Sequence, residues 1–123
     1  MKKKTDFAGL ISLQPRFRAL RGKEIAFGPG KADLLQFVAE TGSIGKAAAR
    51  MNMSYMRAWS LIQTMNSCFK QPVIATLRGG PERGGAELTE TGRRVLKSYR
   101  QMEVAGRTAA QTGWRVLQKL MRK

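Results

Sequence analysis

The chain has no histidine, which is the most common general base and a common metal ligand. Acidic residues, which can serve the same roles, number only eight among its 123 residues. No Asp or Glu pair lies at metal-ligand spacing. Two glycine-rich stretches, GPGK at 28–31 and GGPERGG at 79–85, match no phosphate-binding loop motif, and we expect turns there. This inventory indicates that the protein is not an enzyme and holds no metal or cofactor.

Cysteine and long apolar runs are also nearly absent. The single cysteine, Cys68, cannot form an internal disulfide; its apolar helical surroundings favour a small buried side chain over a reactive thiol. No window approaches the roughly 18 apolar residues of a spanning helix, and the lysines after Met1 precede polar sequence instead of an apolar signal segment. We therefore expect no membrane association and a cytoplasmic, nucleoid-associated protein.

Positive charge is what the chain has in excess. Its 23 Lys and Arg residues against eight acidic ones give a net charge of +15, which indicates a polyanionic partner, with nucleic acid ahead of an anionic membrane. The 42% hydrophobic content is ordinary for one globular domain. We divide the chain into a basic N-terminal segment (1–15), a DNA-binding domain (16–105) and a basic helical tail (106–123).

Apolar periodicity predicts the order of the elements. We expect a β-hairpin at 16–27, helices at 31–41, 44–51 and 55–69, strands at 73–77 and 86–88, a long helix capped by Thr89, and a final helical segment at 111–123. Gly42 should end the first helix, and Gly106 and Gly113 should break or bend the last helical stretch.

A tight turn separates two of these helices. The alanines 47–49 favour helix and have so little bulk that another helix can cross close above them. Asn52 tolerates a left-handed turn, Met53 can fill the corner, and Ser54 can cap the next helix, as Ser43 can cap the one before. In that next helix Ala58, Leu61, Ile62 and Met65 form one apolar stripe.

The element order predicts a mainly α fold with a small β component. Two helices joined by a tight turn, then two strands with a basic tip and a long helix, are typical of a winged helix-turn-helix with a long C-terminal dimerisation helix. In such a fold the second helix of the turn motif enters the major groove of DNA, and the wing grips the backbone.

The segment ETGSIGKAAARMNMSYMRAWSLIQTMN, followed by GGPERGGAELTETGRRVL, closely resembles the N-terminal DNA-binding domain of ModE-type molybdate-responsive regulators. It resembles LysR-type regulators more distantly. The resemblance implies a dimeric bacterial DNA-binding domain whose dimer is built from the first and the long fourth helices. Only about 20 residues follow Met102, where ModE proteins continue into molybdate-binding domains, so we expect no such domain and no molybdate binding by this chain.

Individual side chains suggest contacts to DNA. Arg57 can reach a guanine edge, Ser54 can cap its helix or contact phosphate, and Tyr55 can contact DNA or pack beside the first helix. Trp59 can lie at the edge of the core or face the groove, and we favour the core edge. The candidate DNA-binding residues are Ser43, Lys46, Arg50, Ser54, Tyr55, Met56, Arg57, Ser60, Arg78 and Arg83, with a solvated surface charge as the alternative for the basic ones.

A second set of residues suggests a homodimer. An apolar stripe on the long helix can serve as core, as dimer contact, or as both. The candidate dimerisation residues are Leu34, Val38, Val95, Leu96, Tyr99 and Met102. The tail at 114–123, apolar at Trp114, Leu117, Leu120 and Met121 and otherwise basic, can extend the dimer helix, lie on DNA or touch anionic lipid.

The sequence thus predicts a sequence-specific transcription regulator of the ModE type that lacks a molybdate-binding domain and binds double-stranded DNA as a homodimer. One alternative is an architectural DNA-binding protein with little sequence readout. Another is a sensor of oxyanions such as molybdate.

Overall fold

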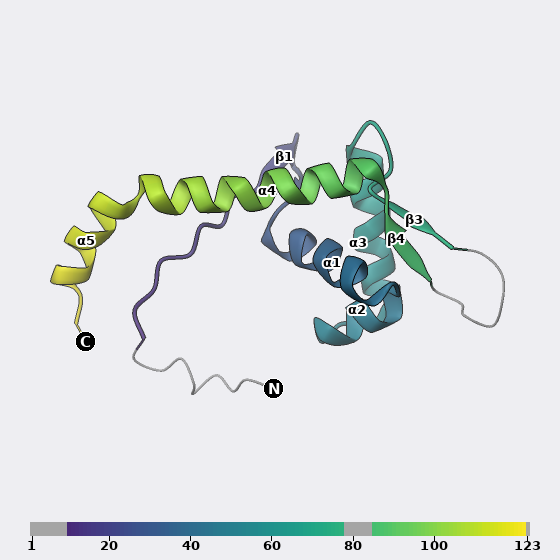
Figure 1. Ribbon diagram of the computed structural model, residues 1–123, viewed down its shortest axis with the longest axis horizontal. Coiled ribbons are helices and arrows are strands. Elements are labelled where there is room, and N and C mark those ends of the chain that lie inside the picture. The colour runs from purple at the N-terminus through teal and green to yellow at the C-terminus, as the bar shows by residue number, and fades with distance from the viewer. Residues whose placement is uncertain (1–9, 78–84, 123) are drawn as a thin grey trace.

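The computed structural model describes residues 10–77 and 85–122. Its elements, in order, are β1 (Ala19–Arg21), β2 (Glu24–Phe27), α1 (Pro29–Thr41), α2 (Ile44–Arg50), α3 (Tyr55–Cys68), β3 (Ile74–Thr76), β4 (Ala86–Leu88), α4 (Glu90–Ala109) and α5 (Gln111–Leu120). The strands form two antiparallel pairs, β1 with β2 and β3 with β4. The predicted winged helix-turn-helix with a long C-terminal helix is confirmed. Figure 1 shows α4 running above α1, α2 and α3 and continuing beyond them into α5.

The core lies among α1, α2, α3 and the small β3–β4 sheet. Its largest fully buried side chains are Leu34, Leu35, Val38, Ile44, Ile62, Met65 and Val73. Ala47, Ala48 and Ala58 are also buried, which agrees with the predicted close crossing of α2 and α3. Each large aliphatic side chain removed from water contributes about 1.5–3 kcal/mol, so this cluster holds the two helices of the turn motif in one arrangement.

The turn between α2 and α3 has the predicted local chemistry. The Ser43 hydroxyl accepts a hydrogen bond from the Lys46 backbone N–H at 3.1 Å, and the Ser54 hydroxyl accepts one from the Arg57 N–H at 3.0 Å. Asn52 has a φ of 55°, the left-handed conformation that Asn tolerates better than most residues. Met53 packs against the core cluster.

The start of α4 is fastened to the segment that precedes β3. The Thr89 hydroxyl accepts from the Gly92 N–H at 2.9 Å and donates to the Pro72 carbonyl at 2.6 Å, and the Thr89 N–H donates to the Val73 carbonyl at 3.0 Å. A Cβ at Gly92 would lie 2.0 Å from that Val73 oxygen. Only glycine therefore fits at this contact.

The N-terminal hairpin β1–β2 packs against α4 through aromatic side chains. The Tyr99 hydroxyl donates to the Phe17 carbonyl at 2.7 Å, and the Phe27 ring meets the Tyr99 ring edge-on at a centroid distance of 5.2 Å. Burial raises the pKa of the Tyr99 phenol, and the nearby Glu103 carboxylate adds to this shift. Arg100 links α4 to α1 by an ion pair with Asp33 at 3.0 Å.

Some boundaries differ from the predicted ones. Helix α1 begins at Pro29 because proline is well suited to the first helical turn. Helix α4 continues through Gly106, the break falls at Ala110, and Gly113 lies inside α5, so the predicted glycine breaks are wrong. Cys68 is only half-buried, with its Sγ 3.4 Å from a Glu24 carboxylate oxygen, because it lies in the last turn of α3 and not in the stripe of Ala58, Ile62 and Met65.

Within residues 10–77 and 85–122, no helix is long and apolar enough to cross a lipid bilayer. No group of three or more acidic, cysteine or histidine side chains in the same ranges could hold a metal ion.

Candidate nucleic-acid interface

The N-terminal end of α3 exposes both polar and apolar side chains to solvent, while the opposite face of the helix is buried. Tyr55 and Met56 are 44% and 66% exposed, and Arg57 and Ser60 are also exposed. On the other side of the same helix, Ala58 and Ile62 are buried. The helix is therefore anchored along one face and offers the other to solvent.

The first turn of α3 has features suited to an anion. Ser54 caps the Arg57 N–H, while the preceding N–H groups of the turn point outward with the positive end of the helix dipole. The Tyr55 ring lies beside α2, with its Cδ1 3.9 Å from where a Cβ at Gly45 would stand. The contact of the Tyr55 ring is thus with α2, whereas the predicted packing was beside the first helix, and a contact of Tyr55 with DNA stays a prediction.

Trp59 is half-buried and packs against the core cluster. This confirms the expectation that it lies at the core edge. This position follows from the helical spacing, because Trp59 lies next to the buried Ala58, at the border between the buried and the exposed faces of α3.

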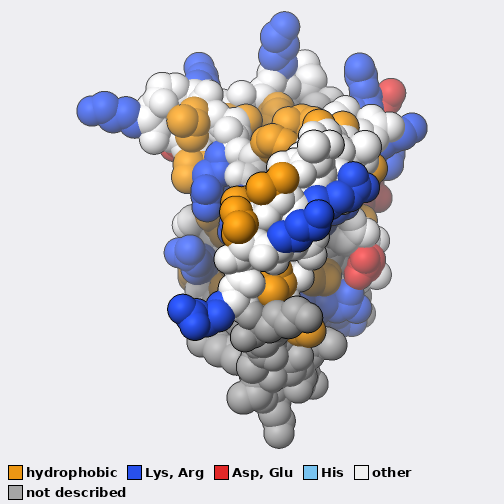
Figure 2. All heavy atoms as spheres, turned by 90° about the vertical axis from the view of Figure 1, so that its left-hand side faces the viewer, with side chains coloured by type: hydrophobic (Ala, Val, Ile, Leu, Met, Phe, Trp, Pro, Cys, Tyr) orange, Lys and Arg blue, Asp and Glu red, His pale blue; other side chains and the backbone are white. Residues whose placement is uncertain are grey.

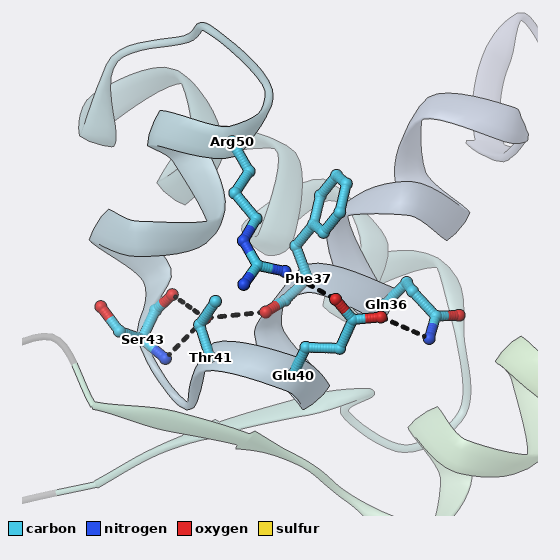
Figure 3. Close-up of polar contacts among 6 residues, drawn as sticks. All are labelled: Gln36, Phe37, Glu40, Thr41, Ser43 and Arg50. Carbon is cyan, nitrogen blue, oxygen red and sulfur yellow. Dashed lines mark hydrogen bonds and ion pairs between the residues drawn. The ribbon is translucent and has the colours of Figure 1, made fainter. Parts of the chain in front are cut away.

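A polar network organises the start of α2 (Figure 3). The Thr41 hydroxyl donates to the Phe37 carbonyl at 2.7 Å and accepts from the Ser43 N–H at 3.2 Å. Ser43 is therefore held at the α1–α2 corner, where its hydroxyl caps α2. Lys46, in the first turn of α2, is exposed.

Arg50 is engaged within the chain, which the sequence did not predict. Its guanidinium forms an ion pair with Glu40 at 2.6 Å and lies over the Phe37 ring, 5.5 Å from the centroid (Figure 3). Gln36 holds the second Glu40 oxygen at 3.0 Å. The predicted phosphate contact by Arg50 therefore competes with an internal partner, and Arg50 differs in this respect from the exposed Lys46 and Arg57.

The wing is tied to the turn motif by backbone bonds. The Ala86 N–H donates to the Gly42 carbonyl at 3.0 Å, and Ser43 and Gly85 form an isolated antiparallel bridge. The base of the wing thus lies beside the N-terminus of α2. The predicted DNA contacts Arg78 and Arg83 lie outside the described residues.

Sequence reasoning left Gln63 out of the candidate contacts. It is exposed on α3, and its spacing of three from Ser60 and seven from Met56 places it on the same face. That helical spacing was the signal that could have found it. Thr41 and Glu40 were missed because their roles depend on partners across the α1–α2 corner.

The candidate dimerisation residues fall into two groups. Leu34 and Val38 have no exposed surface, so both are core residues and the prediction that they contact a second chain is wrong for this conformation. Leu96 and Tyr99 are 9% and 5% exposed and also belong to the core cluster. Val95 is half-buried and Met102 is 49% exposed, so this pair retains surface for a partner.

Val95 and Met102 line an apolar groove. It has a volume of about 480 Å³ and lies between α4, from Thr91 to Met102, and the aromatic side chains Phe17, Phe27 and Phe69. Figure 2, which views the molecule from the α5 end, shows hydrophobic side chains exposed among Lys and Arg side chains. No residue of α5 is buried.

The sequence of the chain is similar to curated regulators over about three fifths of its length. It is 38% identical over 76 residues to the molybdenum transport protein ModE of Azotobacter vinelandii, and 35% identical over 71 residues to the DNA-binding transcriptional dual regulator ModE of Escherichia coli K12. These matches cover 62% and 58% of this chain but 28% and 27% of the relatives. The chain thus spans little more than a quarter of the length of these relatives. No family model matches it.

The fold is similar to that of a LysR-type protein. The DNA-binding domain of CbnR, crystallised with DNA, superposes with a TM-score of 0.52 at 24% identity and covers 68% of this chain and 91% of that one. Full-length CbnR in complex with its target DNA gives the same TM-score at 25% identity, with 27% of that chain covered. The chain therefore has the winged helix-turn-helix fold of a LysR-type DNA-binding domain, and its sequence is similar to the DNA-binding domain of ModE transcription regulators.

Proposed function

We propose that the chain is a sequence-specific, DNA-binding transcription regulator of the ModE type that binds duplex DNA as a homodimer and performs no catalysis. The observation that supports this most directly is the first half of α3. Its exposed face holds Tyr55, Met56 and Arg57, and its opposite face is fixed in the core. A helix positioned in this way can enter the major groove without being reordered.

Each residue of this face has a proposed role. Arg57 donates two hydrogen bonds to a guanine edge, the commonest specific side-chain contact, and Met56 and Tyr55 offer apolar surface to a thymine methyl. Ser60 and Gln63 extend the same face by one and two turns. Ser43, Lys46 and Ser54 contact backbone phosphates near the two helix N-termini.

The wing contributes contacts to the backbone or the minor groove. Arg78 and Arg83 are proposed for this role from the sequence alone, because glycines around them allow close approach to DNA. The bridge between Ser43 and Gly85 supports the proposal, since it sets the base of the wing beside the phosphate-contacting end of α2.

Competition binding tests the proposal. An operator is selected from random duplexes, and its affinity is compared with that of scrambled duplexes at 150 mM salt, a condition under which nonspecific phosphate contacts are weakened by roughly tenfold or more relative to low salt. We expect the selected site to be nearly palindromic and to bind at least about 10³-fold more tightly. Equal affinity for both duplexes would refute sequence-specific regulation and support the architectural alternative, which the net charge of +15 favours.

Two matched variants separate base readout from backbone contact. Arg57→Gln and Lys46→Gln each remove one positive charge from an exposed helix position. Arg57→Gln should cost about 1–3 kcal/mol on the operator and relax the preference at one base pair per half-site. Lys46→Gln should weaken all duplexes alike and reduce the salt slope by about one per subunit. Identical effects of the two variants on all sequences would exclude Arg57 as a base-reading residue.

A further inference from the structure

Helix α5 keeps its apolar and polar side chains on separate sides. With a rotation of about 100° per residue, Trp114, Val116, Leu117 and Leu120 fall within one arc of about 160°. The polar side chains of the helix occupy the rest of the circumference, where Arg115 lies opposite the centre of the apolar arc. The helix is therefore amphipathic along its whole length.

This apolar side is open to solvent. Val116, Leu117 and Leu120 are 55%, 54% and 79% exposed, and no residue of α5 is buried. Figure 1 shows α5 turning away from the line of α4, at the end of α4 that is farthest from α3. A helix of ten residues gains most of its stability from burial of its apolar side, so α5 is suited to a partner that the described residues do not supply.

The width of the apolar arc indicates the shape of that partner. A single partner helix covers a narrow seam, formed by two positions in every seven. On α5 the apolar arc extends beyond such a seam, because Val116 and Trp114 lie at its two borders and Leu117 lies between them. A flat apolar surface covers the whole arc at once.

The charges indicate the sign of the partner. All charged residues that follow Glu103 are Lys or Arg, among them Arg115 and Lys119 of α5. An anionic partner is therefore favoured. The phosphates of DNA would pair with the basic side but leave the leucines of α5 in water, whereas an anionic bilayer offers charged headgroups and apolar acyl chains together.

We propose that α5 binds the surface of an anionic lipid bilayer and lies in the plane of the membrane interface. Leu117 and Leu120 face the acyl chains, and Arg115 and Lys119 face the headgroups and water. Trp114, at the border of the apolar arc, has the amphipathic ring that is enriched at this depth.

This mode of binding requires no spanning helix. The expectation of no membrane association rested on the absence of a spanning segment and of a signal segment, and a helix that lies on a bilayer needs neither. The proposal is also independent of the proposed DNA binding, because α5 and the exposed face of α3 lie at opposite ends of α4 (Figure 1).

Co-sedimentation with vesicles tests the proposal. The full chain is mixed with vesicles of equal parts phosphatidylglycerol and phosphatidylcholine at about 150 mM salt, which screens charges beyond about 8 Å. We expect binding to these vesicles and affinity at least about tenfold lower for pure phosphatidylcholine. Failure of the wild type to bind the mixed vesicles overturns the proposal.

Two double variants separate the apolar contribution from the charge. Leu117→Gln with Leu120→Gln leaves the net charge unchanged and should lower vesicle affinity at least about tenfold. Arg115→Gln with Lys119→Gln should lower it by about tenfold or more, because each basic residue near the surface adds attraction to anionic lipid. The control Leu20→Gln, at a 64% exposed position of β1, should bind like the wild type.

The net charge of the chain provides the main alternative explanation for vesicle binding. If the Leu117→Gln and Leu120→Gln variant binds the vesicles like the wild type, the attraction is electrostatic only and the proposal is overturned. Unchanged binding of duplex DNA by this variant verifies that it is folded, as expected for a helix without buried residues.

Tryptophan fluorescence identifies the part of the chain that meets the lipid. Mixed vesicles should shift the emission to shorter wavelength as the Trp114 ring leaves water. Trp114→Phe should abolish this shift, and Trp59→Phe should retain it. A shift that persists in Trp114→Phe means that another surface binds the vesicles, which contradicts the proposal.

A second copy of the chain is the rival partner for the apolar side of α5. Sedimentation equilibrium without vesicles compares the wild type with the Leu117→Gln and Leu120→Gln variant. Equal self-association of the two proteins supports the lipid surface as the partner. If the variant loses a self-association that the wild type has, the apolar side of α5 is buried between copies and the proposal is overturned.

Discussion

Replacing Gly92 by alanine should destabilise the domain more than its single added methyl group suggests. The new Cβ would lie 2.0 Å from the Val73 carbonyl oxygen and 2.9 Å from the carbon of the same carbonyl. Both neighbours are backbone atoms, so no side-chain rotation relieves the overlap. Either α4 or the segment before β3 has to move by more than 1 Å, which strains the Thr89 hydrogen bonds that begin α4.

The magnitude follows from the cost of overpacking a fixed contact. Such substitutions cost about 1–3 kcal/mol, and we place Gly92→Ala at the upper end because the obstacle is backbone. Alanine is otherwise the better helix former by about 0.8–1.0 kcal/mol, so the measured loss is the strain minus this gain, about 2 kcal/mol. For a domain of this size that corresponds to roughly 8–16 °C in Tm.

Two other glycines of the same helical stretch provide controls. A Cβ at Gly106 would lie 2.5 Å from the tip of the Phe17 ring, a side chain that can turn aside, and a Cβ at Gly113 would meet nothing within 4 Å. Urea unfolding followed by circular dichroism at 222 nm should rank stability in the order Gly113→Ala, Gly106→Ala, Gly92→Ala, with Gly113→Ala at or slightly above the wild type. If Gly92→Ala unfolds within about 0.5 kcal/mol of the wild type, the fixed α4 contact is refuted.

Three further perturbations address single interactions. Ser54→Ala removes the N-cap of α3 and should cost about 1 kcal/mol in urea unfolding, whereas the exposed Ser60→Ala should stay within 0.5 kcal/mol. Glu40→Gln releases Arg50 from its ion pair and removes a negative charge near the proposed phosphate contacts. The affinity for nonspecific DNA should rise, and the slope of its dependence on salt concentration should steepen by up to about one per subunit. An unchanged slope means that Arg50 contacts no phosphate. Burial raises the pKa of the Tyr99 phenol, so the stability that depends on this shift is fully present below pH 10 and is lost as pH rises through the folded-state pKa. Tyr99→Phe should therefore unfold about 1 kcal/mol more easily at pH 7 and lose less stability above pH 10. Equal losses of stability above pH 10 in both proteins would exclude Tyr99 as the cause of the pH dependence.

The local geometry of the turn motif was predictable because it depends on neighbours in sequence. Ser43, Ser54 and Thr89 cap helices whose N–H groups lie three residues ahead, and Asn52 adopts the left-handed turn that its side chain tolerates. The alanines that precede Asn52 were predictable in the same way, because a run of small residues in the local sequence marks where another helix can cross closely. These features specify the fold class without any knowledge of tertiary contacts.

Contacts between distant segments were not predictable in this way. Arg50 forms an ion pair with Glu40 across the α1–α2 corner, and the Tyr99 hydroxyl donates a hydrogen bond to the Phe17 carbonyl, 82 residues away in the sequence. Nothing in the spacing of these residues specifies such partners. For the same reason the sequence could not separate core from dimer surface on α1 and α4, where Val38 proved to be buried and Met102 exposed although both lie on apolar stripes.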